Sequence, residues 1–436
     1  MVLTLQKIVE NGLCIGCGLC RSVAGPDRVE LVMTPEGRER PVLRRPLDEA
    51  TLACINAVCP GTRIAAPEPT DSEAALCDDV WGPVERMAIG YAGDPEVRFR
   101  GSSGGVLTAL GQFLLESGRV RFILHVGASA MAPMRSERRL SFDAASVLEG
   151  AGSRYGPAAP LVDFCEILDR REPFALIGKP CDVTAVRNLA RIDPRVDRYM
   201  RYALTLICGG ASELGKSEDL LRHFGVEEQE LSLFRYRGYG NPGPTRIETR
   251  DGRAFEMTYG EVWQEESTWR IQARCKICPD PIGLAADLAA SDVWPGCNPT
   301  GEDEGFNGIV VRTERGLELF DAAVAAGALR LEREIGFEDL DLFQPHQVRK
   351  RCAAWARLQG LRAAGKPVPQ TEGLGLAACA WRLSLSANLA EARGARDRAR
   401  QGRFDEPHPV AASGEPVRPP AAATAAGCAG QGFRGS

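Results

Sequence analysis

Three cysteines near the N-terminus are evenly spaced. Cys14, Cys17 and Cys20 are separated by two residues each, and Gly16 and Gly18 leave the backbone free to turn between them. Bacterial ferredoxins use this C-x2-C-x2-C spacing to bind a cubane 4Fe–4S cluster. A zinc knuckle is the alternative, but zinc sites usually take their cysteines in two pairs. The spacing therefore predicts a 4Fe–4S cluster in this part of the chain.

The fourth ligand of this cluster must come from farther along the chain. Cys59 precedes Pro60, and a bacterial ferredoxin also places a proline after its fourth cysteine. Cys54 competes with Cys59 for this role. We predict Cys59 as the ligand. The segment 21–53 is too long for a compact two-cluster ferredoxin and lacks a second evenly spaced run, so we expect one cluster in this module.

Four other cysteines lie where they can converge. Cys181 and Cys208 each follow a short apolar run that reads as a strand, and Cys275 and Cys278 form a C-x2-C pair before a proline. In an open α/β sheet, loops at the carboxyl ends of strands meet at one crevice. The four thiols could thus form a second four-ligand site. The alternatives are a zinc half-site or redox dithiol at the C-x2-C pair, and buried packing at the other two cysteines.

A Ser- and Gly-rich turn, Arg100-Gly-Ser-Ser-Gly-Gly105, precedes a segment with the apolar periodicity of a helix, 106–116. Free backbone N–H groups at a helix start bind anions such as phosphate or pyrophosphate. The turn matches neither the Walker loop nor the G-x-G-x-x-G fingerprint. We interpret it as a candidate phosphate site, with an ordinary tight turn as the alternative.

The elements that must position these residues alternate along the chain. Apolar runs predict strands, and amphipathic segments predict helices; the strands are 122–126, 174–178, 202–207 and 308–312, and the helices 106–116, 182–190 and 317–326. This alternation predicts a mixed α/β core. We divide the chain into a ferredoxin-like module (1–67), two parts of the α/β core (78–172 and 173–355), which the resemblance described below implies to be flavin-binding, and a helical extension ending in a low-complexity tail that we expect to be disordered (356–436).

The composition excludes several classes of function. The chain of 436 residues has 15 cysteines but only four histidines, which disfavours a histidine-rich metal site. Its net charge of −5 gives no electrostatic basis for binding nucleic acid. The sequence has neither an apolar stretch long enough to span a membrane nor the pattern of a secretion signal. We expect a cytoplasmic protein with reduced thiols, so a disulfide framework does not explain the cysteines.

An ordered set of short motifs resembles one known family. In chain order they are Gly-Ser-Ser-Gly-Gly at 101–105, Gly-Ser-Arg-Tyr at 152–155, Gly-Lys-Pro-Cys at 178–181, Cys-Gly-Gly at 208–210, Cys-x2-Cys at 275–278, Ala-Asp-Leu-Ala-Ala-Ser-Asp-Val-Trp at 286–294 and Val-Arg-Thr-Glu-Arg-Gly at 311–316. Together they resemble the beta subunit family of coenzyme F420 hydrogenase and dehydrogenase. That family includes 7-hydroxymethyl chlorophyll a reductase and the ferredoxin-dependent divinyl chlorophyllide 8-vinyl reductase.

The resemblance implies an iron–sulfur flavoprotein with two 4Fe–4S clusters and FAD. It implies that the second cluster is bound by Cys181, Cys208, Cys275 and Cys278. It implies that FAD is held by the loop Ser102, Ser103, Gly104 and Gly105, with further candidate contacts from Ser153, Tyr155, Lys179, Asn307 and Arg312. Lys179 has two interpretations, because its charge can neutralise a cluster or stabilise a reduced flavin.

The function implied by the resemblance is an oxidoreductase. Electrons would pass between ferredoxin or a partner subunit and an organic acceptor, through the clusters and FAD, in either direction. The acceptor would be a tetrapyrrole or another small molecule such as a deazaflavin. A non-catalytic electron-relay subunit is the alternative, and a zinc-stabilised interaction protein a third. The sequence names no catalytic residue and is compatible with a homo-oligomer.

Overall fold

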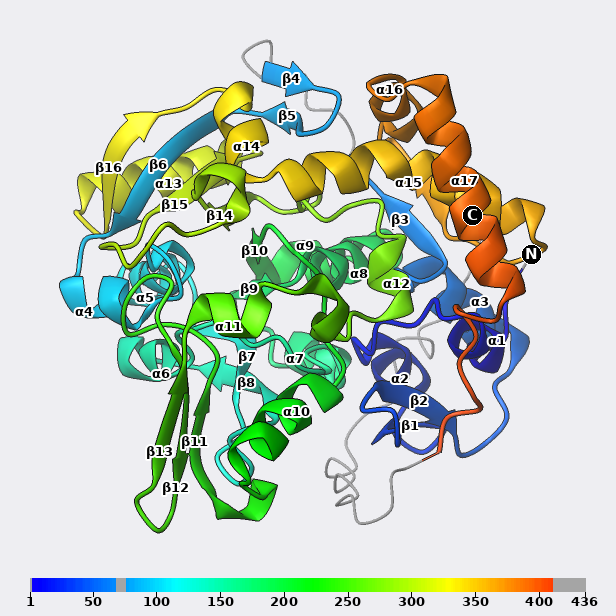
Figure 1. Cartoon of the computed structure of the whole chain (residues 1–436), viewed down its shortest axis with the longest axis horizontal. Coiled ribbons are helices and arrows are strands. Elements are labelled where there is room, and N and C mark those ends of the chain that lie inside the picture. Colours follow the sequence, from blue (N-terminus) through cyan, green and yellow to red (C-terminus); the bar gives the residue numbers. More distant parts are fainter. Residues whose placement is uncertain (1, 68–75, 411–436) are drawn as a thin grey trace.

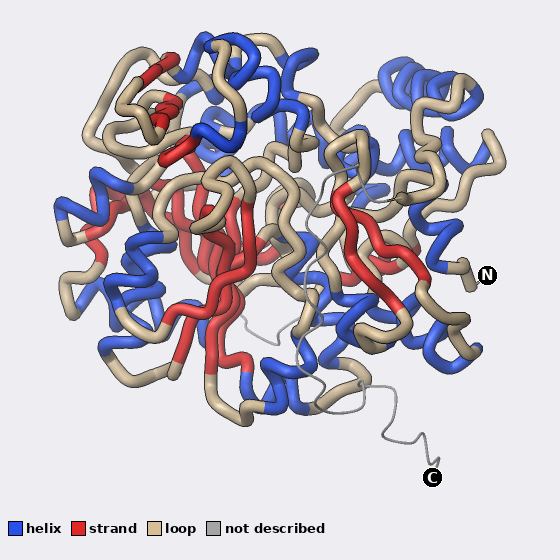
Figure 2. The backbone as a smooth tube through the Cα atoms, turned by 90° about the horizontal axis from the view of Figure 1, so that it is seen from below, coloured by secondary structure: helices blue, strands red, loops and turns tan. Residues whose placement is uncertain are grey.

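A mixed eight-stranded sheet forms the centre of the computed structural model, which describes residues 2–67 and 76–410 (Figures 1 and 2). Across the sheet the strands are β16 (Leu329–Glu334), β6 (Arg86–Ala92), β15 (Asn307–Val311), β14 (Leu288–Asp292), β10 (Met200–Leu206), β9 (Phe174–Gly178), β7 (Phe122–Ala128) and β8 (Ser136–Ser141). Strands β7, β9, β10 and β14 are parallel to one another, and the remaining neighbours pair antiparallel. The mixed α/β class expected from the sequence is confirmed.

Four of these strands, β7, β9, β10 and β15, were predicted from their apolar runs. The edge strands β8 and β16 were missed because their sequences, Ser-Glu-Arg-Arg-Leu-Ser and Leu-Arg-Leu-Glu-Arg-Glu, are mostly polar. An edge strand has one unpaired side and tolerates such residues. Strands β6 and β14 were also missed, although both lie inside the sheet.

Helices cover both faces of the sheet. On one face lie α5 (Val106–Glu116) and α13 (Glu314–Ala325), whose apolar side chains pack with Ile309 and Val311 of β15. On the other face, α8 (Pro180–Ala190) and α15 (Pro345–Ala363) belong to two further apolar clusters, one of which includes Val310. The helices predicted at 106–116, 182–190 and 317–326 are confirmed. None of the described helices combines the length and the apolar character that crossing a bilayer requires.

The N-terminal module is built around a hairpin. Its elements are α1 (Leu5–Glu10), α2 (Leu19–Ala24), β1 (Val29–Met33), β2 (Glu39–Leu43), α3 (Glu49–Val58) and β3 (Arg63–Ala65). The segment 21–53 therefore holds the β1–β2 hairpin and the start of α3. Asp48 caps α3 by accepting a hydrogen bond from the backbone N–H of Thr51 at 2.7 Å. This helix carries the chain back toward the first cysteines and ends at Cys59.

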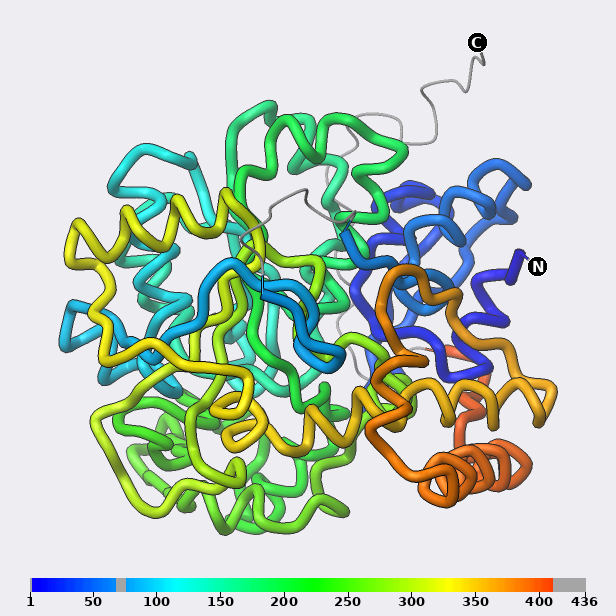
Figure 3. Tube along the Cα trace, turned by 90° about the horizontal axis from the view of Figure 1, so that it is seen from above, coloured from blue at the N-terminus to red at the C-terminus, as the bar shows by residue number. Residues whose placement is uncertain are grey.

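The C-terminal extension packs against the N-terminal module, as the neighbouring orange and blue segments of Figure 3 show. It contains the end of α15, β17 (Gln370–Glu372), α16 (Leu376–Trp381) and α17 (Leu385–Arg400), while α14 (Phe337–Phe343) precedes it. Strand β17 pairs in parallel with β3. Helices α15 and α17 share one apolar cluster with Leu13 and Cys14. The low-complexity tail predicted at the C-terminus lies, from residue 411 on, outside the described residues.

An insertion between β10 and β14 forms a small sheet with its own apolar cluster. It contains α10 (Gly215–Phe224), β11 (Leu231–Arg235), β12 (Thr245–Thr249), β13 (Ala254–Met257), α11 (Tyr259–Trp263) and α12 (Ala273–Lys276). Elsewhere lie α4 (Pro95–Arg100), α6 (Ala144–Glu149), α7 (Phe164–Asp169), α9 (Arg195–Tyr199), β4 (Leu76–Asp78) and β5 (Gly82–Val84). The insertion covers the carboxyl end of the parallel strands.

His125 makes the stability of the sheet depend on pH. Its imidazole lies 2.7 Å from Ser141 Oγ, and burial lowers its pKa from 6.5 to about 4. The stability supplied by the neutral ring is complete above pH 6.5 and falls as the pH drops toward 4, by about 1.4 kcal/mol per unit. Urea denaturation at several pH values between 6.5 and 4 measures the effect. The free energy of unfolding of His125→Gln should fall less steeply with decreasing pH than that of the parent protein. The exposed His408 is the control, and an equal flattening in His408→Gln would contradict this assignment.

Candidate functional site

The predicted cysteines and polar residues gather at one edge of the sheet. Lys179 and Cys181 follow β9, Cys208 follows β10, Asp292 ends β14 and Asn307 begins the antiparallel β15. This edge carries the carboxyl ends of the parallel strands, where open α/β sheets bind ligands. The convergence expected from the positions of Cys181 and Cys208 is thus present.

The first cavity is lined by Cys14, Cys17, Cys20 and Cys59. Gly16 has a φ of +70°, and a side chain there would come within 2.6 Å of the carbonyl of Glu39, so the cysteine loop needs glycine at this position. Two thiols accept backbone hydrogen bonds, Cys14 from Gly16 at 3.4 Å and Cys59 from Gly61 at 3.3 Å. Cys54 does not line this cavity and packs instead against the apolar cluster beneath α2 and α3.

Burial dominates the electrostatics of this cavity. It raises the pKa of Cys14 to about 11 and the pKa values of Cys17, Cys20 and Cys59 above their ordinary value. Neighbouring thiols add to the effect at Cys17 and Cys20. Thiolates are therefore costly here unless a metal centre compensates their charge. Four buried thiols that face one cavity suit a metal cluster better than free cysteines.

The second cavity is lined by Cys181, Cys208, Cys275 and Cys278. Cys181 lies in the first turn of α8, and α12 carries Cys275, whose sulfur accepts a hydrogen bond from the backbone of Ala211 at 3.4 Å. Burial raises the pKa of Cys208 to about 12, and the pKa values of Cys181 and Cys278 are also raised. Three cationic residues, Lys179, Arg274 and Lys350, and one acidic residue, Asp280, also line this cavity.

The two cavities adjoin, because Ile15 lines both. Within residues 2–67 and 76–410, no three His, Cys, Asp or Glu side chains lie close enough together to hold a single metal ion. A cubane cluster has a different requirement, since its four cysteine ligands surround four irons. Each cavity has the four thiols of such a ligand set.

Lys179 belongs to the second cavity. Its ammonium group lies 2.7 Å from Asp182 Oδ2. Burial alone would lower the pKa of Lys179, but Asp182, Cys181 and Cys208 raise it above its ordinary value. The lysine therefore stays charged, and its position agrees with the interpretation that it neutralises a cluster.

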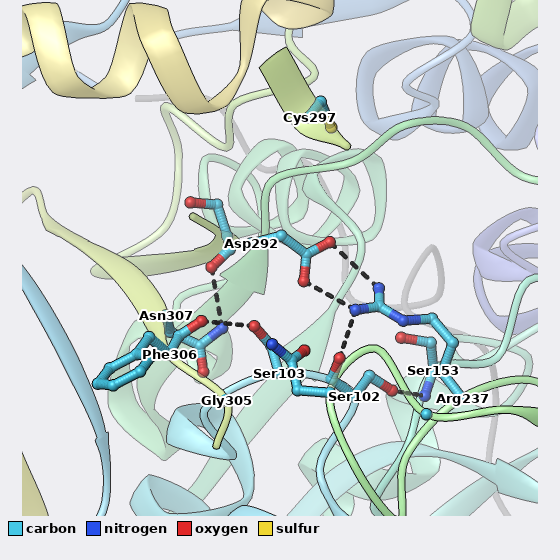
Figure 4. Close-up of polar contacts among 12 residues, drawn as sticks. Ser102, Ser103, Ser153, Arg237, Asp292, Cys297, Gly305, Phe306 and Asn307 are labelled. Carbon is cyan, nitrogen blue, oxygen red and sulfur yellow. Dashed lines mark hydrogen bonds and ion pairs between the residues drawn. The ribbon is translucent and has the colours of Figure 1, made fainter. Parts of the chain in front are cut away.

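The Ser- and Gly-rich loop is tied to two neighbouring segments (Figure 4). Ser102 Oγ accepts a hydrogen bond from the backbone of Ser153 at 2.6 Å. Ser103 Oγ donates to the carbonyl of Phe306, also at 2.6 Å. The structure thus brings Ser153 to the loop, as the motif order suggested.

The loop leaves a row of donors at the start of α5. Within the described residues, the backbone N–H groups of 102–105 donate to no protein acceptor, whereas that of Val106 donates to Asn307 Oδ1 at 3.2 Å. A side chain at Gly104 would lie 2.8 Å from the backbone of Asn307 and 2.9 Å from that of Gly90. Free N–H groups at a helix start favour an anionic group such as a phosphate. The loop therefore fits the phosphate site expected from the sequence.

Arg237 and Asp292, which the sequence analysis missed, meet beside this loop (Figure 4). The guanidinium donates to both carboxylate oxygens, at 3.0 and 3.1 Å, and also to the carbonyl of Ser102 and to the hydroxyl of Tyr155. It packs against two rings, those of Tyr259 and Trp294. Its buried Nε has no hydrogen-bond partner among the described residues. A charged residue at the end of an apolar strand was the available signal for Asp292, whereas Arg237 had none.

Arg312, a flavin contact expected from the resemblance, lies apart from the Ser- and Gly-rich loop. Arg312 follows the opposite end of β15 and donates to three carbonyls, those of Trp81, Pro83 and Ile282. Arg312 is therefore not brought to the Ser- and Gly-rich loop. Cys297 does not line the second cavity and lies 4.0 Å from His346 Nε2.

Comparison with known proteins gives a consistent assignment. Residues 87–165 match the profile of the coenzyme F420 hydrogenase/dehydrogenase beta subunit N-terminal part, and residues 172–335 match that of its C-terminal part. An uncharacterized protein of Methanocaldococcus jannaschii is 22% identical over 77% of this chain and 93% of its own length. The coenzyme F420-dependent sulfite reductase of the same organism is 24% identical over 75% of this chain, which covers 48% of that enzyme.

A solved structure supports the fold. A chain of the F420-reducing [NiFe] hydrogenase complex from Methanosarcina barkeri superimposes with a TM-score of 0.52 at 17% identity, covering 67% of this chain and 98% of that one. The two profile matches together span more than half of the sequence and include the Ser- and Gly-rich loop and the second group of cysteines. The chain belongs to the coenzyme F420 hydrogenase/dehydrogenase beta subunit family.

Proposed function

We propose that this chain is an iron–sulfur flavoprotein that passes electrons between a redox partner and a deazaflavin of the coenzyme F420 type. The observation that carries the proposal is the arrangement of eight cysteines around two adjoining cavities. The names of the family and of its relatives, an F420-dependent sulfite reductase and an F420-reducing hydrogenase complex, support the deazaflavin over a tetrapyrrole. The redox partner would be ferredoxin or another subunit, and the location the cytoplasm.

Two groups of cysteines would hold the two clusters. Cys14, Cys17, Cys20 and Cys59 would hold one 4Fe–4S cluster in the ferredoxin-like module, and Cys181, Cys208, Cys275 and Cys278 the other. Bound clusters transfer single electrons, and bound FAD exchanges a hydride with an organic substrate. Ile15 lines both cavities, while Lys179, Arg274 and Lys350 would offset negative charge in the second.

The flavin-binding part of the proposal rests on the loop at 101–105. Its free backbone N–H groups would hold the phosphates of FAD, with Ser153 and Asn307 fixing the shape of the loop. Arg237 has an unpaired buried N–H that could donate to the cofactor, and Tyr155 orients that guanidinium. No side chain of the described residues is assigned a catalytic role.

Anaerobic purification followed by iron, sulfide and flavin analysis tests the proposal. We expect about eight irons and eight sulfides per chain from two cubane clusters, together with one FAD. Addition of reduced coenzyme F420 should bleach the flavin and iron–sulfur absorption. A colourless protein that contains zinc would refute the redox function. Bleaching by reduced ferredoxin but not by reduced F420 would refute the deazaflavin as substrate and leave a relay or a different acceptor.

A further inference from the structure

The C-terminal extension inserts a carboxylate into the N-terminal module. Glu406 follows α17, and its side chain is only 4% exposed. Its two oxygens accept hydrogen bonds from Arg40, Oε2 from Nε at 2.7 Å and Oε1 from Nη2 at 2.9 Å. The backbone N–H of Glu406 donates to the carbonyl of Glu10, and the carbonyl of Phe404 packs against Gly12. The segment is therefore fixed beside the loop that carries the first cysteines.

Arg40 lies between the two cavities. The next residue, Pro41, lines the first cavity, and Gln272, which accepts a hydrogen bond from Arg40 Nη2 at 2.9 Å, lines the second. The Arg40 side chain is 1% exposed. One buried cation thus lies next to residues that line each of the two cavities.

A second ion pair, between Arg38 and Glu213, lies beside the Arg40–Glu406 pair. Arg38 Nε donates to Glu213 Oε1 at 2.7 Å, and Arg38 Nη1 lies 3.6 Å from Glu406 Oε2. The two arginines and two glutamates together have no net charge. Removing any one of them would leave an uncompensated charge in a poorly screened interior, where electrostatic effects are strong.

We propose that the Arg40–Glu406 pair sets the reduction potentials of both clusters and that the C-terminal extension supplies the carboxylate of this pair. The inference rests on the proposed function, because it requires both clusters. Reduction adds one negative charge to a cluster, so the cation of Arg40 favours the reduced state and the anion of Glu406 opposes it. Glu406 lies beyond residue 335, where the family match ends, so this carboxylate comes from outside the matched core.

A redox titration followed by electron paramagnetic resonance tests the proposal on two variants of the purified holoprotein. E406Q should raise both cluster potentials, and R40Q should lower both. We expect at least a tenfold change in each one-electron equilibrium constant, which corresponds to about 59 mV. A merely structural role would shift the potentials of the two variants in the same direction or leave them unchanged, and either result would overturn the proposal.

Asp405 provides a matched control on the same segment. Its carboxylate pairs with Lys366 and is 48% exposed, so D405N should leave both potentials unchanged. If R40Q loses its clusters, the test depends on E406Q, whose side chain has nearly the same shape as that of the parent. Cluster potentials in E406Q that are unchanged or lowered would then refute the inference. Iron and sulfide in the parent protein are measured first. Absence of two clusters there would refute the proposed function, whereas two clusters with unresponsive potentials would refute only the role of this pair.

Discussion

Replacing Cys59 with serine should remove about half of the iron from the protein. Each cubane cluster contributes four irons, so a loss from about eight to about four per chain is expected when one cluster is lost. The physical reason is that Cys59 completes the thiol lining of the first cavity, whereas the other three cysteines come from one short segment, the loop with Cys14 and Cys17 and the first turn of α2 with Cys20. Iron and sulfide analysis of anaerobically purified protein measures the effect.

Cys54 is the matched control, because it lies on α3, the helix that ends at Cys59. Cys54→Ser should retain all of the iron, since this thiol packs against apolar side chains and does not line the cavity. Paramagnetic resonance of the reduced Cys59→Ser protein should show only the second cluster. Iron loss in Cys54→Ser with full retention in Cys59→Ser would reverse the assignment of the fourth ligand.

Replacing Arg237 with methionine should lower the free energy of unfolding by about 3–5 kcal/mol, which is typical when one partner of a buried ion pair is removed. Arg237 is 5% exposed and Asp292 is 22% exposed, so the carboxylate would be left largely out of solvent without its partner. The change also removes a donor to the carbonyl of Ser102. Denaturant titration of the cofactor-free protein measures the stability, and flavin analysis of the holoprotein should show FAD loss.

The origin of this effect can be separated from a general loss of arginine. Arg246 forms an exposed pair with Glu256, and Arg246→Met should change stability by no more than about 1 kcal/mol. The double variant Arg237→Met with Asp292→Asn should recover part of the stability, because no buried charge then remains unpaired. A double variant as unstable as Arg237→Met alone would place the effect in the lost packing against the neighbouring rings.

The sequence was most informative about the cysteines, whose residue type and spacing together predict a metal-binding motif. The even run of Cys14, Cys17 and Cys20 needs no long-range information, because one short segment, a loop and the first turn of α2, sets the relative positions of the three thiols. Apolar runs likewise predicted the buried strands β7, β9, β10 and β15. The polar edge strands escaped prediction because a strand with one free side need not be apolar.

The positions of Cys181 and Cys208 show what can be predicted from the direction of strands in a sheet. Both were expected at one crevice because parallel strands end at the same edge of a sheet, and both line the second cavity. The same logic did not place Arg312, which lies at the opposite end of β15 because this strand runs antiparallel to β14. Strand direction depends on pairing between distant segments and cannot be obtained from a local pattern.

By itself, the sequence determined the local groupings of thiols, the Ser- and Gly-rich turn and the apolar strands, because each depends on residues near one another in the chain. The tertiary structure places Cys59, but not Cys54, in the lining of the first cavity, because the end of α3 lies against it. It also joined Arg237 to Asp292 and Arg40 to Glu406. Buried charged residues are paired by the packing of segments that are remote in the sequence, and local sequence patterns do not predict that packing.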